Sequence, residues 1–316
     1  MVRVKVLLAA ILVVVLPSGA PTQQRAKQRV ILDTDIGTDI DDAWALAFVI
    51  AHSEFDPLGV TISDADTPAR ARIACKMLHL AGRSEVPVAV GRQTPTPAGR
   101  IDYQFSWAED FSAKKPIAQT AADFIVEQAK RHRGDLTLIA VGPLQNVADA
   151  LRKEPALAQC FKRVVLMSGC IYGTARKPQP VPEWNVVAST ADAQVVYAAG
   201  LPLTIVPLDS TTHVELQETE RERVRRRASP LTTALEALYR LWLSNPSSRM
   251  TLHDQLAVAE TARPGAFFGR VETLPLVVDD QGYTRIDRAR GKPVAVCLEP
   301  KRDAFMEYYL GELVKR

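Results

Sequence analysis

Short apolar runs rich in β-branched residues alternate along the chain with segments of helical length. The apolar runs lie at residues 29–33, 57–62, 136–141, 164–167 and 203–207, and the helical segments at 42–52, 68–81, 118–131, 144–152 and 191–199. Strands and helices that alternate at this spacing are typical of a parallel sheet covered on both faces. The pattern therefore predicts an α/β fold with a mostly parallel central sheet flanked by helices.

The end of the chain follows a different pattern. Residues 274–278 and 283–286 are two short apolar runs on either side of Asp279-Asp280-Gln281-Gly282, which predicts a hairpin. Because a hairpin pairs antiparallel strands, this end of the chain differs from the parallel pattern before it. A last helix is predicted over residues 303–315.

Composition limits the possible classes of protein. The chain has 316 residues and 47% hydrophobic content, enough for one large domain or two small ones. Neither a linker rich in Pro, Gly or Ser nor an internal repeat divides it, which favours a single domain. A net charge of +3 is too small to indicate a nucleic-acid or membrane-surface partner.

The cysteines and one charged segment are predicted to be structural. The four cysteines are widely spaced and form no CxxC pair, so we expect buried small apolar residues rather than a zinc site or disulfides. They are Cys75, Cys160, Cys170 and Cys297. The charge-rich segment 218–227, which ends in three arginines, is predicted to be a solvated helix face rather than an anion site.

The first residues read as a targeting segment. Arg3 and Lys5 precede an apolar run over 6–16, and small residues occupy 18–20. This order predicts a signal peptide or N-terminal anchor over 1–24, with the folded domain over 25–316, and export to the periplasm or the cell exterior. Pro21 is unfavourable directly after the cleavage site, so a cut at another position and retention as an anchor both stay open.

An acidic stretch after the first apolar run carries the strongest chemical signal. Five carboxylates fall within ten positions, directly before a helical segment: Asp33, Asp35, Asp39, Asp41 and Asp42. Like charges at this density repel, so folding them together requires a compensating cation. Oxygen ligands alone indicate a hard ion such as Ca²⁺ or Mg²⁺ rather than zinc. The stretch follows a strand, where α/β proteins place their active sites.

Three later segments are suited to meet this stretch. Val141 ends an apolar run before a Gly-Pro turn and a helix, so its carbonyl is free to bind a cation. Glu183 and Asn185 flank a tryptophan and offer partners for hydroxyl groups. His253-Asp254 offers a proton donor and a further carboxylate. Each segment alone is more often an ordinary turn or helix cap.

Other classes of site fit these residues poorly. An EF-hand loop begun at Asp33 needs Gly at its sixth position and Glu at its twelfth, where Thr38 and Trp44 stand. A haloacid-dehalogenase-like phosphatase would have Thr or Val at the position of Gly37. A dinucleotide site is disfavoured because no GxGxxG follows a strand.

In their order, the four motifs resemble the inosine-uridine-preferring nucleoside hydrolase family. That family has an Asp-x-Asp-x-Gly-x-Asp-Asp-Ala stretch, a Gly-x-Leu-x-Asn turn, a Glu-aromatic-Asn motif and a late His-Asp. The matching residues here extend from Asp33 to Asp254, nearly the whole mature chain. The resemblance implies an α/β fold with a mixed sheet and one deep Ca²⁺-containing pocket, and it makes 25–316 a nucleoside hydrolase-like catalytic domain. It also implies hydrolysis of the N-glycosidic bond of ribonucleosides to ribose and a free purine or pyrimidine base, and a homo-oligomer, dimer or tetramer.

The resemblance also implies roles for individual residues. The implied catalytic residues are Asp35, which takes a proton from water, and His253, which assists the leaving base. Metal ligands are Asp35, Asp42, Asp254 and the carbonyl of Val141, and Asp33 supports the acidic loop. Substrate contacts are Asp41, Asp39, Asp66, Met167, Glu183 and Asn185. Tyr239 and Trp242 either line the base side of the pocket or pack in the core.

The chain departs from the family pattern in two places. Its acidic loop is two residues longer, so Asp39 and Asp41 compete for one role. Lys177 stands where the family has an Asn, with Gln179 as a substitute for the lost contact. A cation there suits an anionic, modified riboside. A secreted calcium-containing nucleoside-binding protein without turnover is the other alternative.

Overall fold

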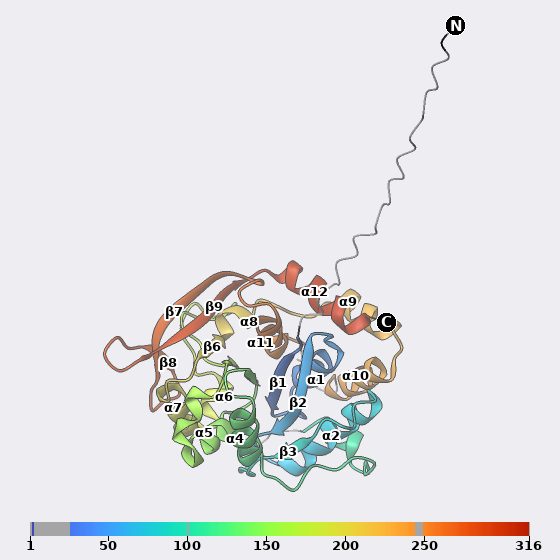
Figure 1. Ribbon diagram of the computed structural model, residues 1–316, viewed down its shortest axis with the longest axis horizontal. Helices are drawn as coiled ribbons and strands as arrows, with labels where there is room; N and C mark the ends of the chain where they lie inside the picture. The colour runs from blue at the N-terminus through green and yellow to red at the C-terminus, as the bar shows by residue number, and fades with distance from the viewer. Residues whose placement is uncertain (1, 3–25, 99, 101, 244–248, 316) are drawn as a thin grey trace.

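A nine-stranded mixed sheet runs through the molecule in the order β3-β2-β1-β4-β5-β6-β9-β7-β8 (Figure 1). Its strands are β1 (Gln28–Thr34), β2 (Phe55–Ile62), β3 (Val88–Val90), β4 (Leu136–Ala140), β5 (Arg163–Met167), β6 (Leu203–Val206), β7 (Phe268–Val278), β8 (Thr284–Ile286) and β9 (Lys292–Pro300). All neighbouring pairs from β3 to β9 are parallel, and β7 pairs antiparallel with β8 and β9. The predicted mostly parallel, mixed sheet is confirmed.

The structure, a computed structural model, describes residues 2, 26–98, 100, 102–243 and 249–315. Apart from Val2, the predicted signal segment 1–24 lies outside the described residues. Within the described part, no helix has the length and apolar character needed to cross a membrane.

Helices cover both faces of the sheet (Figure 1). They are α1 (Asp41–Ala51), α2 (Thr67–Leu80), α3 (Phe105–Ala108), α4 (Ala121–Arg131), α5 (Gln145–Lys153), α6 (Trp184–Val187), α7 (Thr190–Ala198), α8 (Leu208–Thr211), α9 (Glu218–Arg226), α10 (Pro230–Trp242), α11 (His253–Ala262) and α12 (Arg302–Val314), with a 3₁₀ turn η1 (Pro155–Gln159). The five helices predicted between the first strands correspond to α1, α2, α4, α5 and α7.

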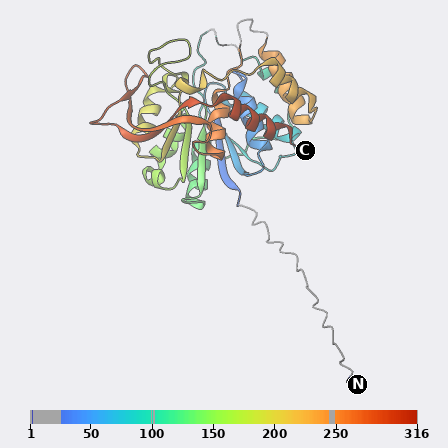
Figure 2. The same ribbon diagram turned by 90° about the horizontal axis from the view of Figure 1, so that it is seen from above.

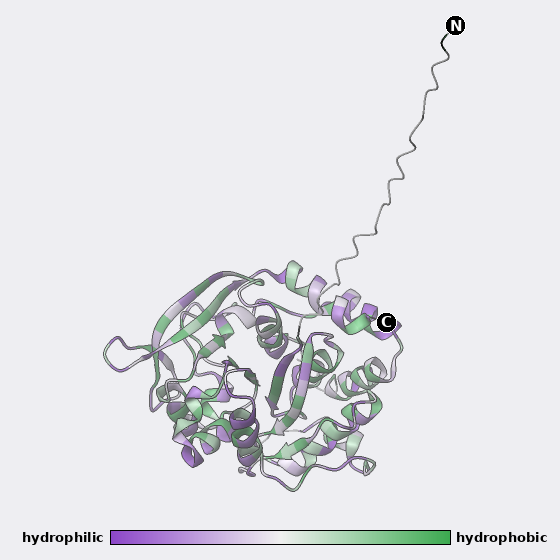
Figure 3. Cartoon of the chain, viewed as in Figure 1, coloured by the Kyte–Doolittle hydropathy of each residue, from purple (hydrophilic) through white to green (hydrophobic). Residues whose placement is uncertain are grey.

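Two hydrophobic clusters, one on each face, explain why the central strands consist largely of apolar residues. Along β1, Val30 and Leu32 pack with α1, α2 and α11, whereas Ile31 between them packs with α4, α5 and α7. Side chains alternate across a strand, so a strand covered on both faces is apolar at consecutive positions along most of its length. In Figure 3, β1 is coloured as hydrophobic, in contrast to the surface helix α9.

The hairpin and the last helix are also confirmed, with one difference. Strands β7 and β8 pair as predicted, and their ribbon projects to one side of the sheet (Figure 2). The sequence pattern did not predict β9, which follows the hairpin and inserts between β6 and β7. It therefore joins the parallel part of the sheet to the antiparallel part.

The features interpreted as structural behave as expected. All four cysteines are buried and unpaired. The charged segment forms α9, in which Glu222 pairs with Arg225 and Arg226 along the solvent-exposed surface. Its other charges also pair with the neighbouring helices, Arg221 with Glu236 of α10 and Glu220 with Arg302 of α12, so they are used in structural ion pairs.

The carboxyl ends of the parallel strands lie at one edge of the sheet, and the candidate residues follow them. Asp35 comes directly after β1, Val141 directly after β4, and Met167 is the last residue of β5. Parallel strands place such residues next to one another even when they are more than a hundred positions apart in sequence. The fold thus gathers the four motifs at this edge.

Candidate active site

Asp41, Asp42 and Asp254 form a buried carboxylate cluster. Each offers one carboxylate oxygen, and these oxygens lie within 4.8 Å of one another. Asp41 and Asp42 begin α1, and Asp254 lies in the first turn of α11. The side-chain amide of Gln255 donates to the carbonyl of Asp41 at 2.7 Å and so ties the two helix starts together. Both helix N-termini direct their positive dipole ends toward the cluster, which favours carboxylates there.

Asp35 lies beside this cluster in the turn that follows β1. The turn packs closely against the β4–α5 turn, because a side chain at Gly142 would come within 2.8 Å of both the backbone nitrogen and the Oδ1 atom of Asp35. A residue larger than glycine at this position would displace Asp35. The Gly-Pro turn therefore has a specific steric role at the site.

A cavity of about 240 Å³ opens above the cluster. It is lined by Asp35, Asp39, Asp41, Asp42, Val141, Met167, Glu183, Trp184, Asn185, Leu208, His253 and Asp254. Every site residue predicted from the sequence except Asp66 lines this cavity. Trp184 and Leu208 are additional lining residues, and Trp184 could have been included because it stands between Glu183 and Asn185.

Glu183 and Asn185 face the cluster from the opposite wall. Glu183 is buried and accepts hydrogen bonds from the backbone nitrogens of Gly169, at 3.1 Å, and Asn185, at 2.7 Å. The amide of Asn185 donates to the carbonyls of Val141, at 2.7 Å, and Met167, at 3.1 Å. These bonds hold both side chains in place before any ligand binds. The Val141 carbonyl keeps a second lone pair for a cation.

His253 lies next to the cluster with its ring tied to α8. Its Nδ1 atom is 2.7 Å from the hydroxyl of Thr211. Burial lowers the pKa of His253 to about 4, so the ring is neutral near pH 7. When the Thr211 hydroxyl donates to Nδ1, the hydrogen resides on Nε2, and a neutral ring can still donate a hydrogen bond there.

The profile of the family described as inosine-uridine preferring nucleoside hydrolase matches residues 30–307. The chain belongs to this nucleoside hydrolase family. Uridine nucleosidase 1 of Arabidopsis thaliana is 27% identical to it over 91% of this chain and 94% of the relative. The pyrimidine-specific ribonucleoside hydrolase RihA of Shewanella oneidensis is 29% identical over 90% of this chain and 95% of the relative. The resemblance found in the sequence is confirmed, and the protein is an N-ribohydrolase.

Solved structures of nucleoside hydrolases share the fold. A plant nucleoside hydrolase matches with a TM-score of 0.81 at 23% identity, covering 92% of this chain and 99% of its own. A purine-preferring ribonucleoside hydrolase from Gardnerella vaginalis matches with a TM-score of 0.78 at 24% identity, covering 91% and 98%. The predicted nucleoside hydrolase fold is thereby confirmed.

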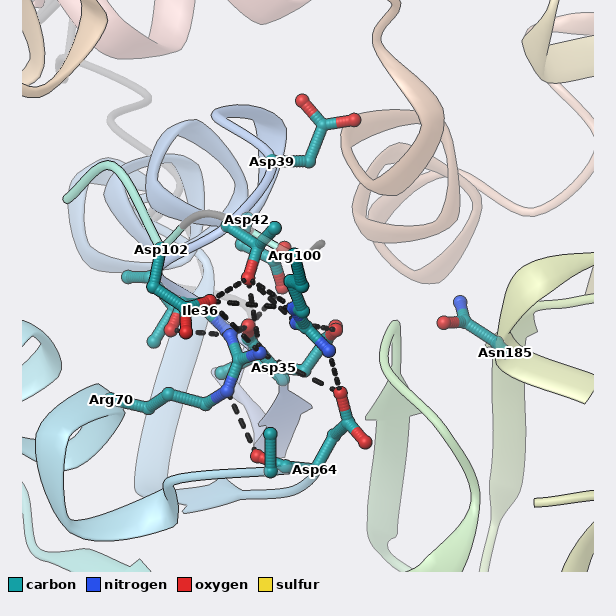
Figure 4. Close-up of polar contacts among 12 residues, drawn as sticks. Asp35, Ile36, Asp39, Asp42, Asp64, Arg70, Arg100, Asp102 and Asn185 are labelled. Atoms are coloured by element: carbon teal, nitrogen blue, oxygen red, sulfur yellow. Dashed lines mark hydrogen bonds and ion pairs between the residues drawn. The ribbon is translucent and has the colours of Figure 1, made fainter. Parts of the chain in front are cut away.

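The longer acidic loop of this nucleoside hydrolase places Asp39 and Asp41 differently. Asp41 is buried and belongs to the carboxylate cluster. Asp39 is exposed at the cavity rim, with its carboxylate bonded to the backbone nitrogen of Ile40 at 2.7 Å. Figure 4 shows Asp39 well apart from Asp35 and Asp42. The geometry therefore gives the position inside the site to Asp41.

Asp66, predicted to contact the substrate, lies elsewhere. It is the N-cap of α2, where its carboxylate accepts a hydrogen bond from the backbone nitrogen of Ala69 at 3.0 Å, and it does not line the cavity. The residue that approaches the site from this segment is Asp64, which is buried two positions after the end of β2. The chain takes a left-handed turn at Asp64 and Ala65, and Asp66 then caps α2.

Four further residues that the sequence offered as candidate substrate contacts do not line the cavity. Lys177 and Gln179 are exposed, and Lys177 is part of a tight turn with Thr174. Trp242 is buried in the hydrophobic cluster, and Tyr239 packs against it with ring centroids 5.6 Å apart. Trp242 thus packs in the core, although its side chain also hydrogen-bonds Asp39 at the cavity rim, and Tyr239 packs half-buried at the edge of the same cluster.

The electrostatics of the cluster fit a bound cation. Burial, followed by mutual repulsion, raises the pKa of Asp41 and Asp254 well above the usual range. Burial raises the pKa of Asp35 to about 7, with repulsion from Asp64 adding to it and Arg100 opposing it. Buried carboxylates at this density are stable as anions only beside compensating positive charge. The residues present, carboxylate and carbonyl oxygens alone, can hold a hard metal ion.

Two buried arginines next to the cluster were not predicted from the sequence (Figure 4). Arg70 of α2 is fully buried and donates to the carbonyls of Asp35 and, at 3.0 Å, Ile36. Arg100 approaches from the segment between β3 and α3 and pairs with Asp64 at 2.5 Å. Isolated arginines carry no motif, so only the fold reveals this pair.

We expect the metal-free protein to lose stability as pH rises from about 4 to 7. Burial raises the pKa of Asp33 and Glu183 to about 7, whereas both groups ionise near pH 4 when unfolded. Between these values the folded state binds more protons, so its stability is greatest below pH 4 for these groups and is lost as pH rises through 7. In chelator, the melting temperature should fall by several degrees between pH 5 and pH 8.

The matched control for this prediction is Asp33→Asn. An asparagine can still accept the hydrogen bonds from Thr61, at 2.5 Å, and Asn146, at 2.7 Å, but does not titrate. Its melting curve should depend less on pH than that of the wild type. A wild-type melting temperature in chelator that is equal or higher at pH 8 would contradict the assignment of raised pKa values.

Proposed function

We propose that the protein hydrolyses the N-glycosidic bond of neutral ribonucleosides in a calcium-dependent reaction that releases ribose and a free purine or pyrimidine base. The observation that carries this proposal is the oxygen-only cluster of Asp41, Asp42 and Asp254 at the floor of a cavity whose facing wall holds Glu183 and Asn185. One wall suits a cation and the other suits sugar hydroxyls.

Calcium is the ion that this donor set favours. Ca²⁺ takes six to eight oxygen ligands in flexible geometry, from carboxylates, carbonyls and water. By the family resemblance, Asp35, Asp42, Asp254 and the Val141 carbonyl would hold it, and Asp41, the third member of the cluster, would bind the ribose beside it. When bound, the ion orients a water molecule and the ribose hydroxyls and lowers the pKa of the water.

The residues of the chain account for the remaining requirements of the reaction. Asp35 takes the proton from the water beneath the anomeric carbon, because calcium is too weak a Lewis acid to dispense with a base. Asp41, Glu183 and Asn185 bind the ribose hydroxyls, and Met167 lies against the sugar. The transition state has oxocarbenium character, and the surrounding carboxylates stabilise its positive charge.

A neutral riboside fits this cavity better than an anionic one. Its lining residues include six carboxylates and, within the described part of the chain, no Lys or Arg. Lys177, which suggested an anionic substrate, is exposed and does not line the cavity. Even with a bound divalent ion the cavity keeps a negative charge that disfavours a phosphate or carboxylate substituent.

For localisation and assembly we propose export to the periplasm or the cell exterior, and a homo-oligomer. The basic start, apolar run and small residues of segment 1–24 support export. The family resemblance supports a dimer or tetramer. N-terminal sequencing of the secreted protein and light scattering of the purified protein test the two proposals.

The function is tested by measuring release of reducing sugar from inosine, uridine, adenosine, cytidine and uridine 5′-monophosphate, with and without chelator. We expect release from at least one neutral nucleoside, loss of release in chelator and recovery with added calcium. The monophosphate should react at least about 100-fold more slowly than uridine. Tight calcium and nucleoside binding without any release would instead support the binding-protein alternative.

We expect His253→Ala to slow hydrolysis mainly for nucleosides with poor leaving groups. A hydrogen bond from Nε2 to the departing base lowers the barrier most where the base is least stable as an anion. A general acid of this kind contributes roughly 10²–10⁴-fold. The rates of the variant on uridine and on a p-nitrophenyl riboside should diverge by about 100-fold or more. An equal loss on both substrates would contradict the acid role.

The control for this measurement is Thr211→Val. It removes the hydroxyl that lies 2.7 Å from Nδ1 while it retains the ring itself. The variant should show a weaker version of the same leaving-group dependence, because the orientation and tautomer of His253 are no longer fixed. No dependence in this variant would show that the hydroxyl does not set the tautomer.

A further inference from the structure

Asp64 and Ala65 hold a backbone conformation that side chains rarely adopt. Their φ angles are 65° and 50°, in the left-handed region. The hydroxyl of Thr94 contacts the carboxylate of Asp64 at 3.1 Å and accepts a hydrogen bond from the nitrogen of Ala65 at 2.8 Å. Arg70 donates to the carbonyl of Asp64 at 2.9 Å. Strain held in this way gathers at functional sites, where it places a side chain.

The side chain placed by this turn is the carboxylate of Asp64, which receives Arg100. The Nη1 atom of Arg100 lies 2.5 Å from Asp64 Oδ2, and its Nε atom lies 3.3 Å from Asp102 Oδ1. Its Nη2 atom lies 2.6 Å from the hydroxyl of Thr38. With these anchors and a side chain only 8% exposed, the guanidinium group has one defined position.

From this position Arg100 reaches the carboxylate of Asp35 (Figure 4). Its Nη2 atom is 3.7 Å from Asp35 Oδ2. Among the ion pairs of the described residues, this is the one that a cation makes with the Asp35 side chain. Arg70 contacts the backbone of Asp35 instead. The two arginines thus hold different parts of the same residue.

Arg100 also supports the cavity wall on the sugar side. Its guanidinium carbon lies 5.9 Å from the centroid of the Trp184 ring, within the range of a cation–π contact. Trp184 lines the cavity between Glu183 and Asn185. A single side chain outside the cavity lining therefore contacts residues on both sides of the site.

We infer that Arg100 is a positioning residue that fixes the orientation of the Asp35 carboxylate relative to the sugar wall, with the strained Asp64 turn as its anchor. This inference rests on the proposed function of Asp35 as base. Arg100 does not serve as a cation for an anionic substrate, because Asp64, Asp102 and Asp35 share its charge. Misplacement of a reacting group by about 1 Å can cost on the order of 100-fold in rate.

The test compares Arg100→Gln, Arg100→Lys and the control Arg92→Gln. Arg92 lies in the same segment after β3 and also pairs with carboxylates, those of Asp149 and Asp192, but it does not line the cavity. Calcium affinity is measured by titration calorimetry, and kcat and KM with uridine and inosine. Crystal structures of the calcium-loaded variants show the Asp35 side chain.

For Arg100→Gln we expect kcat to fall on the order of 100-fold, with KM and calcium affinity within about threefold of the wild type. Arg100→Lys should recover part of the loss, and Arg92→Gln should leave kcat within about twofold. In the crystals, Asp35 should be reoriented only in Arg100→Gln. An Asp35 carboxylate unmoved in Arg100→Gln, or a kcat like that of Arg92→Gln, would overturn the inference. A wild type without turnover would refute the proposed function, and the crystal structures would still decide the positioning role.

Discussion

Replacement of Asp254 by alanine should abolish nucleoside hydrolysis and remove most of the calcium affinity. Asp254 supplies one of the three oxygens of the carboxylate cluster, and no other described carboxylate from α11 lines the cavity. Loss of a hydrogen-bond partner outside the ligand shell already costs 10–100-fold in metal affinity, so loss of a ligand should cost more than about 100-fold. We expect kcat to fall by at least about 10³-fold, because the ion contributes several kcal/mol.

The matched control is Asp303→Ala. Asp303 is the second residue of α12, as Asp254 is the second residue of α11, but its side chain is fully exposed and, among the described residues, pairs only with Arg302 at 3.5 Å. The control should keep calcium affinity and kcat within about twofold. Calorimetric titration and steady-state kinetics on both variants provide the comparison. Calcium affinity that survives in Asp254→Ala would place the metal elsewhere.

Much of the fold could be predicted because its signals are local. A buried parallel strand is apolar at consecutive positions along most of its length, so β1, β4, β5 and β6 are visible as short apolar runs in the sequence. Strand β9 carries exposed or half-buried positions at its start, Lys292 and Pro293 among them, and its place between β6 and β7 depends on long-range pairing. No local pattern encodes such pairing.

In the candidate site, too, residues with a local sequence signal could be predicted, whereas those that depend on long-range contacts could not. Its acidic stretch and the Glu183-Trp184-Asn185 motif are continuous in sequence, and the edge of the sheet brings them together. The choice between Asp39 and Asp41 depends on where α1 begins, which a two-residue insertion obscures. Arg100 and its partner Asp64 are 36 positions apart in the sequence. Their contact also depends on a left-handed turn at Asp64 and Ala65, which cannot be predicted because neither residue is a glycine.

Replacement of Asp35 by asparagine should separate the two roles proposed for this residue. An amide oxygen can still bind calcium, although more weakly than a carboxylate, but an amide cannot take a proton from water. We therefore expect kcat to fall by roughly 10²–10⁴-fold, the contribution of a positioned general base, while calcium binding persists. Stopped assays for released base and calorimetric titration with calcium measure the two effects. A variant that keeps calcium and more than about a tenth of the wild-type kcat would show that another group activates the water. Loss of calcium as complete as in Asp254→Ala would instead make Asp35 a ligand whose role as base has to be tested with Asp35→Glu.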